Sequence, residues 1–211
     1  IPEMSPKRHF WEKKPKHLTH PIMVKDGSRN VINEAFRILR TNLEFVTDSS
    51  KKENIFCTTS YNPGNGKTFI TLNIAVSLAI KGKKVLLIDG DMRHTSLSKA
   101  FDSPGIGISG YLAGKIDDVD MIIKHDSEHG LDVIPTGAIP PNPTELLYSP
   151  RLKQLLDIVR ERYDYIFIDC PPSDIVADTS IITKYAGRTF RIIRVGMLER
   201  SMLPKLQDGY D

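Results

Sequence analysis

A short glycine-rich segment between an apolar run and a helical pattern constrains the fold of this chain more than any other feature. The segment reads SYNPGNGKT and ends at Thr68. Gly64 and Gly66 allow backbone N–H groups to converge on a phosphate, and the helix that follows adds the positive end of its dipole. Lys67 has the length to reach the β- and γ-phosphates of a nucleotide, and the Thr68 hydroxyl is a ligand for Mg²⁺. The sequence therefore predicts a phosphate-binding loop, although the usual pattern G-x-x-x-x-G-K-[ST] has glycine where this chain has Tyr61.

Two further apolar runs end in aspartates. The run VLLIDGD contains Asp89 and Asp91, and the run YIFIDCPP contains Asp169. In open α/β sheets the ligand crevice lies beyond the carboxyl ends of the strands, so these carboxylates are expected to converge on the phosphate loop. A lone aspartate at a strand end is more often a cap or a turn residue, but three beside one phosphate loop predict a Mg²⁺–nucleotide site. The expected metal residues are Thr68, Asp89, Asp91 and Asp169, and the expected nucleotide residues are Pro63, Gly64, Asn65, Gly66, Lys67, Thr68 and Phe69.

Strands and helices are expected to alternate over most of the chain. The expected strands cover residues 54–59, 84–89, 131–135, 164–169 and 189–195. The expected helices cover 30–46, 68–80, 144–161, 175–185 and 201–207, and residues 105–114 are expected to form a loop with a short helix. Strands with little apolar–polar alternation, separated by helices, favour a parallel sheet covered on both faces. Right-handed crossovers make such a sheet doubly wound.

The first 28 residues differ in composition from the rest. Residues 1–25 hold six lysines or arginines against two glutamates, a net charge of +4, whereas the whole chain of 211 residues carries +3. We expect a basic extended arm over 1–28, either a solvated tail or a contact to an anionic surface, and one domain over 29–211. Two cysteines are too few for a disulfide framework and favour a reducing compartment. Because the chain begins with Ile1, we expect it to be part of a longer polypeptide.

The motifs together resemble those of the bacterial tyrosine kinases, which act with polysaccharide co-polymerases in capsule and exopolysaccharide production. The loop, VLLIDGDMR (Walker A′) and YIFIDCPP (Walker B) occur in that family's order, and NEAFRILRTNL is similar to its E-x-x-R-x-x-R helix. The implied fold is a P-loop NTPase of the deviant Walker group, which includes ParA and MinD. The implied activity is an ATP- and Mg²⁺-dependent protein-tyrosine autokinase that phosphorylates a neighbouring subunit and regulates polysaccharide synthesis and export.

The resemblance also assigns roles to individual residues. It implies that Asp89 is the base for the attacking tyrosine, that Asp91 and Asp169 serve the metal, and that Arg93 steadies the second acidic loop. The implied catalytic set is Lys67, Asp89, Asp91 and Asp169. The helix residues that would join subunits into a ring, with eight subunits by resemblance, are Glu34, Arg37 and Arg40. Taken alone, those three residues indicate intrahelical ion pairs on a solvated face.

The surroundings of the domain also follow from the resemblance. It implies a fused or separate membrane activator domain and a location at the cytoplasmic face of the inner membrane, with no nucleic-acid partner. The family's tyrosine-rich tail is not visible, since only Tyr210 lies near the end of the chain. Either that tail lies outside this chain, or the acceptor of this protein differs from that of the family.

Two other functions stay open on the sequence. The first is a ParA/MinD-like ATPase switch without kinase activity. The loop of that group, K-G-G-x-G-K-[ST], has a lysine where this chain has Asn62 and a glycine where it has Pro63. The second is a non-catalytic assembly module, in which the nucleotide only sets the oligomeric state.

Overall fold

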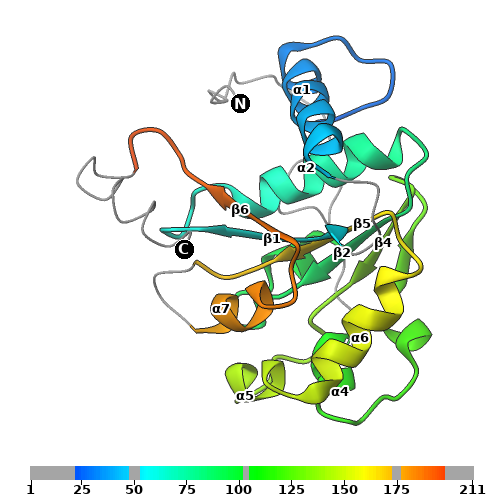
Figure 1. Cartoon of the computed structure of the whole chain (residues 1–211), viewed down its shortest axis with the longest axis vertical. Coiled ribbons are helices and arrows are strands. Elements are labelled where there is room, and N and C mark those ends of the chain that lie inside the picture. The colour runs from blue at the N-terminus through cyan, green and yellow to red at the C-terminus, as the bar shows by residue number, and fades with distance from the viewer. Residues whose placement is uncertain (1–21, 48–52, 102–104, 173–176, 198–211) are drawn as a thin grey trace, which may run out of the picture.

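Six strands form one mostly parallel sheet in the order β3-β4-β2-β5-β1-β6 (Figure 1). The computed structural model describes residues 22–47, 53–101, 105–172 and 177–197. The strands are β1 (Ile55–Ser60), β2 (Val85–Asp89), β3 (Lys124–Asp126), β4 (Leu131–Ile134), β5 (Tyr165–Asp169) and β6 (Arg188–Ile192). Only β3 runs antiparallel to its neighbour, β4. The predicted α/β fold with a mostly parallel sheet is confirmed.

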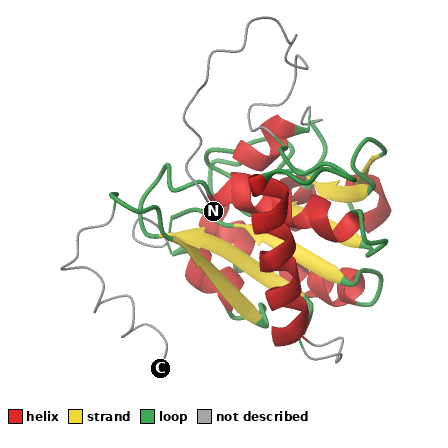
Figure 2. Ribbon diagram, turned by 90° about the horizontal axis from the view of Figure 1, so that it is seen from above, coloured by secondary structure: helices red, strands yellow, loops and turns green. Residues whose placement is uncertain are grey.

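Helices cover both faces of this sheet. They are α1 (Val31–Val46), α2 (Lys67–Ala79), α3 (Ser96–Ala100), α4 (Ile108–Leu112), α5 (Pro143–Leu147), α6 (Pro150–Arg160) and α7 (Asp178–Thr183), with a 3₁₀ helix, η2 (Val119–Ile122). Helices α1 to α3 contribute to the core on one face, and α4 to α7 to the core on the other. In Figure 2, α1 is the helix nearest the viewer and lies over the strands.

The two cores explain why the strands show little alternation. In β5, Ile166 and Ile168 enter the core beneath α4 to α7, while Tyr165 and Phe167 enter the core beneath α1 and α2. All five residues of β5 are buried, so both faces of the strand select apolar side chains. The Phe167 ring stacks on that of Phe56 in β1, at 5.4 Å between ring centroids.

The structure differs from the predicted elements at several places, since the short helices α3 and η2 were not expected either. The helix expected over 144–161 is two helices, α5 and α6, so that prediction is wrong. Pro150 has no backbone N–H and begins α6, and the Ser149 hydroxyl caps that helix by accepting from the N–H of Arg151. Strand β3 is absent from the expected elements, because its three residues KHD are polar and lie at the edge of the sheet. The helix expected over 201–207 and residues 1–21 of the expected arm lie outside the described residues.

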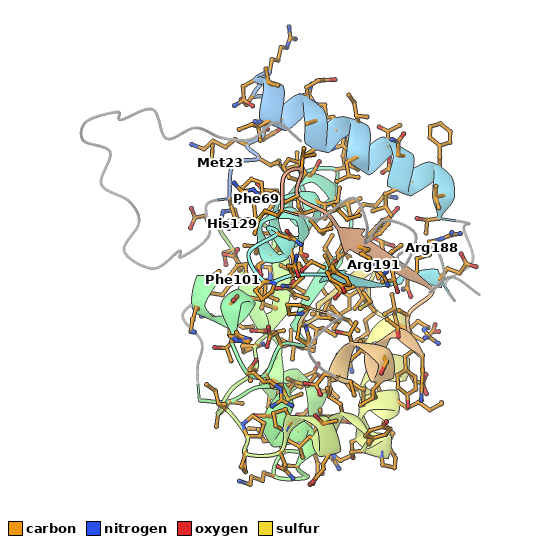
Figure 3. The ribbon with its side chains drawn as sticks, turned by 90° about the vertical axis from the view of Figure 1, so that its left-hand side faces the viewer. Met23, Phe69, Phe101, His129, Arg188 and Arg191 are labelled. Atoms are coloured by element: carbon orange, nitrogen blue, oxygen red, sulfur yellow. The ribbon has the colours of Figure 1, made fainter. Side chains whose placement is uncertain are left out.

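Part of the predicted arm packs on the domain. The Asn73 side-chain oxygen on α2 accepts from the backbone N–H groups of Met23 (2.7 Å) and Val24 (3.0 Å). Val24 is buried in the core between α1 and α2. Figure 3 shows Met23 and Phe69 one above the other below α1. The packed region therefore begins upstream of residue 29. Within the described ranges, the structure holds no helix with both the length and the apolar character needed to cross a lipid bilayer.

Candidate active site

The glycine-rich loop connects β1 to α2 as the sequence analysis expects. Gly64 and Gly66 have φ angles of 78° and 88°, a region that favours glycine. Gly66 is the N-cap of α2 and has no side chain to accept from the first turn. The N–H groups of that turn therefore remain available to an anion at the loop, with Lys67 as the first helical residue.

Thr68 and Asp169 form the centre of the site. The Thr68 hydroxyl donates to Oδ2 of Asp169 at 2.6 Å, across from α2 to the end of β5. The other carboxylate oxygen, Oδ1, is buried and has no hydrogen-bond partner in the described part of the chain. Burial raises the pKa of Asp169 to about 7, although the Thr68 hydrogen bond lowers it and the Asp89 charge raises it further. A buried carboxylate with a free oxygen beside a hydroxyl fits a bound Mg²⁺.

Asp89 lies beside Asp169 in the sheet, at the end of β2. Its Oδ2 accepts from the Ser98 N–H (2.8 Å) and the Ser98 hydroxyl (2.5 Å), and its Oδ1 accepts from the Asp91 N–H (3.3 Å). The Ser98 hydroxyl in turn accepts from the N–H of Thr136, after β4. Burial raises the pKa of Asp89 to about 6, against the lowering effect of the Ser98 hydrogen bonds. Asp89 is thus fully buried and tied to α3 and to the loop after β4.

Asp91 lies two residues further along the same loop. Its Oδ1 accepts from the N–H groups of Arg93 (3.2 Å) and His94 (3.1 Å), and the His94 ring lies against the same carboxylate. Asp91 is 6% exposed, whereas Asp89 is 0% exposed. Of the two aspartates in this loop, Asp91 is therefore the nearer to solvent.

The charged groups fit a magnesium site that is completed by a substrate. Among the described residues, no three His, Cys, Asp or Glu side chains form a cluster that could hold a metal alone. Mg²⁺ usually takes one or two protein carboxylates together with waters and nucleotide phosphates. Thr68 and Asp169 match this donor set, since both offer oxygen at the edge of the phosphate loop.

Two cysteines flank the site but do not supply a nucleophile. The Cys57 and Cys170 sulfurs lie 2.9 Å apart, and both thiols are free and fully buried. Burial and the neighbouring Cys57 raise the pKa of the Cys170 thiol well above its usual value. Because a thiolate is the reactive form, Cys170 is a packing residue beside Asp169.

One predicted nucleotide residue turns its side chain away from the loop. The Phe69 ring packs edge-on against Phe36 of α1, with 6.0 Å between ring centroids. Any contribution of Phe69 to the candidate site would therefore come from its backbone, in the first turn of α2. Asn65 lies within the loop with its side-chain oxygen buried and unpartnered among the described residues, which suits a donor brought by a ligand.

The predicted interface residues of α1 lie in two different environments. Glu34 and Arg37 are partly exposed and pair with each other at 3.1 Å. Arg40 is 8% exposed and donates to the backbone and side-chain oxygens of Ser77 on α2. Sequence reasoning missed three of the apolar residues that α1 exposes, Val31 (71%), Ile38 (57%) and Phe45 (85%). Their spacing of seven residues was the available signal.

A family model for an AAA domain matches residues 53–185 of this chain. The chain is 35% identical over 194 residues to tyrosine-protein kinase etk of Escherichia coli (strain K12), covering 90% of the chain and 26% of that relative. It therefore spans about a quarter of that relative's length. It is 34% identical over 177 residues to tyrosine-protein kinase CpsD of Streptococcus agalactiae serotype III (strain NEM316), covering 83% of the chain and 75% of CpsD.

Two kinds of solved structure are similar to this fold. The kinase domain of Escherichia coli tyrosine kinase ETK superimposes with a TM-score of 0.84 at 31% identity, covering 98% of this chain and 78% of that one. The septum site-determining protein MinD of Pyrococcus horikoshii OT3, complexed with Mg-ADP, gives a TM-score of 0.57 at 25% identity. That match covers 66% of this chain and 57% of MinD.

Proposed function

Because this chain belongs to the bacterial tyrosine-protein kinase family, we propose that it transfers the γ-phosphate of ATP to tyrosine hydroxyls of a neighbouring copy, with Mg²⁺. The observation that carries the proposal is the Thr68–Asp169 pair, whose free carboxylate oxygen lies buried at the loop before α2. Phosphoryl transfer depends mostly on positioning and charge neutralisation, which such a site supplies.

Each charged residue of the site has a separate role in this reaction. Lys67 and the first N–H groups of α2 bind the β- and γ-phosphates, and Thr68 with Asp169 would hold Mg²⁺, which neutralises phosphate charge. The tyrosine oxygen bonds to the γ-phosphorus while the bond to the β-phosphate oxygen breaks and ADP leaves. Asp91, the more exposed of the two aspartates in the loop after β2, would face the Mg²⁺–nucleotide complex beside Asp169. One of Asp89 and Asp91 would accept the tyrosyl proton.

A product measurement separates this kinase from the two alternatives. The full-length protein with ATP and Mg²⁺ is expected to form ADP and phosphotyrosine together in the early phase of the reaction. Formation of ADP without phosphotyrosine would instead indicate a ParA/MinD-like ATPase switch. Nucleotide binding without either product would indicate an assembly module and would contradict the kinase proposal.

We also propose that copies of this chain associate through α1. Val31, Ile38 and Phe45 form an exposed stripe one heptad apart, beside the exposed Glu34–Arg37 pair. An apolar stripe of this kind is suited to contact with another protein surface. A closed ring, such as the eight-membered one expected from the family, would bring the tyrosines of one copy to the site of the next.

Variants of the exposed stripe are expected to reduce the oligomer size. Ile38→Ser with Phe45→Ser removes apolar contact area from α1 without touching its buried face, so nucleotide binding should persist. Arg40→Ala is a poorer test, because it also removes the hydrogen bonds to Ser77. Met121→Ser is the control, since Met121 is 61% exposed on η2. The molar mass from light scattering should fall for the double variant alone, and an unchanged mass contradicts the interface.

The cellular setting is part of the same proposal. ATP and free thiols such as Cys57 and Cys170 fit a reducing interior, which supports a location at the cytoplasmic face of the inner membrane. There the chain would act as the cytoplasmic domain of a membrane protein, with a fused or separate activator domain. Its phosphorylation state would regulate capsule or exopolysaccharide synthesis and export.

A further inference from the structure

A buried aspartate outside the recognised motifs anchors the loop that carries Asp91. Asp178 begins α7 and is 1% exposed. Its Oδ2 accepts from Nε of Arg93 at 3.3 Å, and its Oδ1 accepts from the Thr144 hydroxyl of α5 at 2.5 Å. Arg93 also donates through Nη2 to the Thr144 hydroxyl at 3.0 Å. The three side chains thus close a triangle that joins the loop after β2 to α5 and α7.

The directions of these hydrogen bonds are mutually consistent. The Thr144 hydroxyl donates its one hydrogen to Asp178 and accepts from Arg93 with a lone pair. Both carboxylate oxygens of Asp178 are used, and the arginine supplies the positive charge that a buried carboxylate requires. Arg93 is therefore held at both its Nε and its Nη2, which fixes the path of its side chain.

This triangle reaches the site through the backbone of Arg93. The N–H groups of Arg93 and His94 both donate to Oδ1 of Asp91, so the position of this backbone sets the orientation of the carboxylate. The same loop contains Thr95, whose φ of 52° is the only positive value among the described residues other than glycine. A conformation that costs of order 1 kcal/mol persists only where surrounding contacts determine it. The side-chain triangle is such a set of contacts.

We propose that Asp178 and Thr144 are positioning residues of this kinase: by holding Arg93 they orient the Asp91 carboxylate for the magnesium–nucleotide complex. The inference rests on the proposed function and adds two residues that no motif includes. Partners that orient metal ligands from a second layer typically change metal affinity about 10- to 100-fold when they are lost. The two residues act on Asp91 through Arg93, and neither lies in the phosphate loop.

The test uses Asp178→Asn and Thr144→Val in the full chain. Asp178→Asn keeps the shape of the side chain and removes the charge that Arg93 contacts, and Thr144→Val removes the hydroxyl at constant volume. We expect the Mg²⁺ concentration at half-maximal binding of a fluorescent ADP analogue to rise about 10-fold in each. Binding of the analogue in EDTA should change less than twofold, because the phosphate loop is untouched. Thr144→Ser keeps the hydroxyl and should restore the wild-type Mg²⁺ response.

A matched control separates this role from general stability. Glu53→Gln removes the 2.9 Å ion pair with Arg188 at the opposite edge of the sheet, and it should leave the Mg²⁺ response unchanged. An unchanged Mg²⁺ midpoint in both Thr144→Val and Asp178→Asn overturns the inference, whatever happens to the melting temperature. The inference is also overturned if the variants lose the same factor in affinity for the ADP analogue with Mg²⁺ and in EDTA. Because binding is measured instead of phosphotransfer, a wild-type protein that binds Mg²⁺–ADP but forms no phosphotyrosine contradicts only the kinase proposal.

Discussion

Replacing Asp169 by asparagine is expected to stabilise the ligand-free protein and to abolish most of its phosphotransfer. The carboxylate is buried at the end of β5, with one oxygen on Thr68 and the other unpartnered among the described residues. Without a cation the ionised carboxylate is poorly solvated, and this burial raises the pKa of Asp169 to about 7. The neutral amide avoids that cost but cannot neutralise a metal ion. We expect a loss in kcat of roughly 100-fold or more.

The stabilisation should depend on pH in a defined direction. Asp169 has a folded pKa of about 7 against the ordinary value of 3.8. Below 3.8 the carboxyl is protonated in both states, and the Asn variant gains nothing from the missing charge. Between 3.8 and 7 the unfolded chain loses the proton that the folded chain keeps, so wild-type stability falls relative to the variant. Above pH 7 the free energy of unfolding of Asp169→Asn should exceed that of the wild type by a constant amount of about 4 kcal/mol. The cost of burying an amide N–H₂ group without an acceptor reduces this gain.

Melting curves at pH 4, 6 and 8, without Mg²⁺ or nucleotide, measure this difference. Asp164→Asn is the matched control. Asp164 is exposed, directly precedes the first residue of β5, and accepts a hydrogen bond from the N–H of Lys84. That control should show no stabilisation at high pH and should retain phosphotransfer. A wild-type protein that is as stable as Asp169→Asn at pH 8 contradicts the buried, uncompensated carboxylate. Full activity in the variant contradicts its role at the metal.

The sequence predicts the parts of this site that are contiguous along the chain. The phosphate loop and the strand-end aspartates each lie next to a continuous apolar run, and a run of this kind in a parallel sheet is buried on both faces. The carboxyl ends of such strands meet at one edge, which places Asp89 beside Asp169 without any knowledge of the fold. Local patterns were therefore sufficient for the fold class and for the centre of the site.

The rest of the site depends on contacts between distant segments. Thr144 and Asp178 are 34 residues apart and meet only because α5 and α7 cover the same face of the sheet. Ser98 reaches Asp89 from a five-residue helix that carries no motif. Arg40 lies on a helix that the sequence predicts, but the side that α1 turns toward Ser77 is decided by packing on α2. No local pattern distinguishes these polar residues from those on a solvated surface.

Gly107→Ala is expected to destabilise the protein by about 3 kcal/mol, because two backbone segments meet where a side chain would begin. A Cβ built on Gly107 would lie 2.2 Å from the carbonyl oxygen of Pro135 and 2.4 Å from the nitrogen of Gly137. Gly107 has an extended φ of −178°, so the requirement is for space alone. Backbone atoms cannot rotate away as a flexible side chain would. An alanine must therefore push α4 from the loop after β4.

This separation should also disturb the site. The segments are joined by hydrogen bonds from Ile108 to Pro135 (2.8 Å) and from Ser109 to Thr136 (3.0 Å). The N–H of Thr136 donates to the Ser98 hydroxyl, which donates to Asp89, so a shift of this loop reaches the acidic motif in two steps. We expect kcat to fall in Gly107→Ala at temperatures where the variant is still folded.

Gly105→Ala provides the control two residues away. Among the residues that the structure describes, a methyl group added at Gly105 would have no atom within 4 Å apart from those of its chain neighbours, and the φ of Gly105 does not lie in the left-handed region. The free energy of unfolding of this variant should lie within about 0.5 kcal/mol of the wild-type value, since exposed substitutions away from special contacts have small effects. Urea unfolding gives both values. If Gly107→Ala unfolds at the same urea concentration as Gly105→Ala, the close approach of α4 to the loop after β4 does not exist in solution, and the link from that loop to Asp89 fails with it.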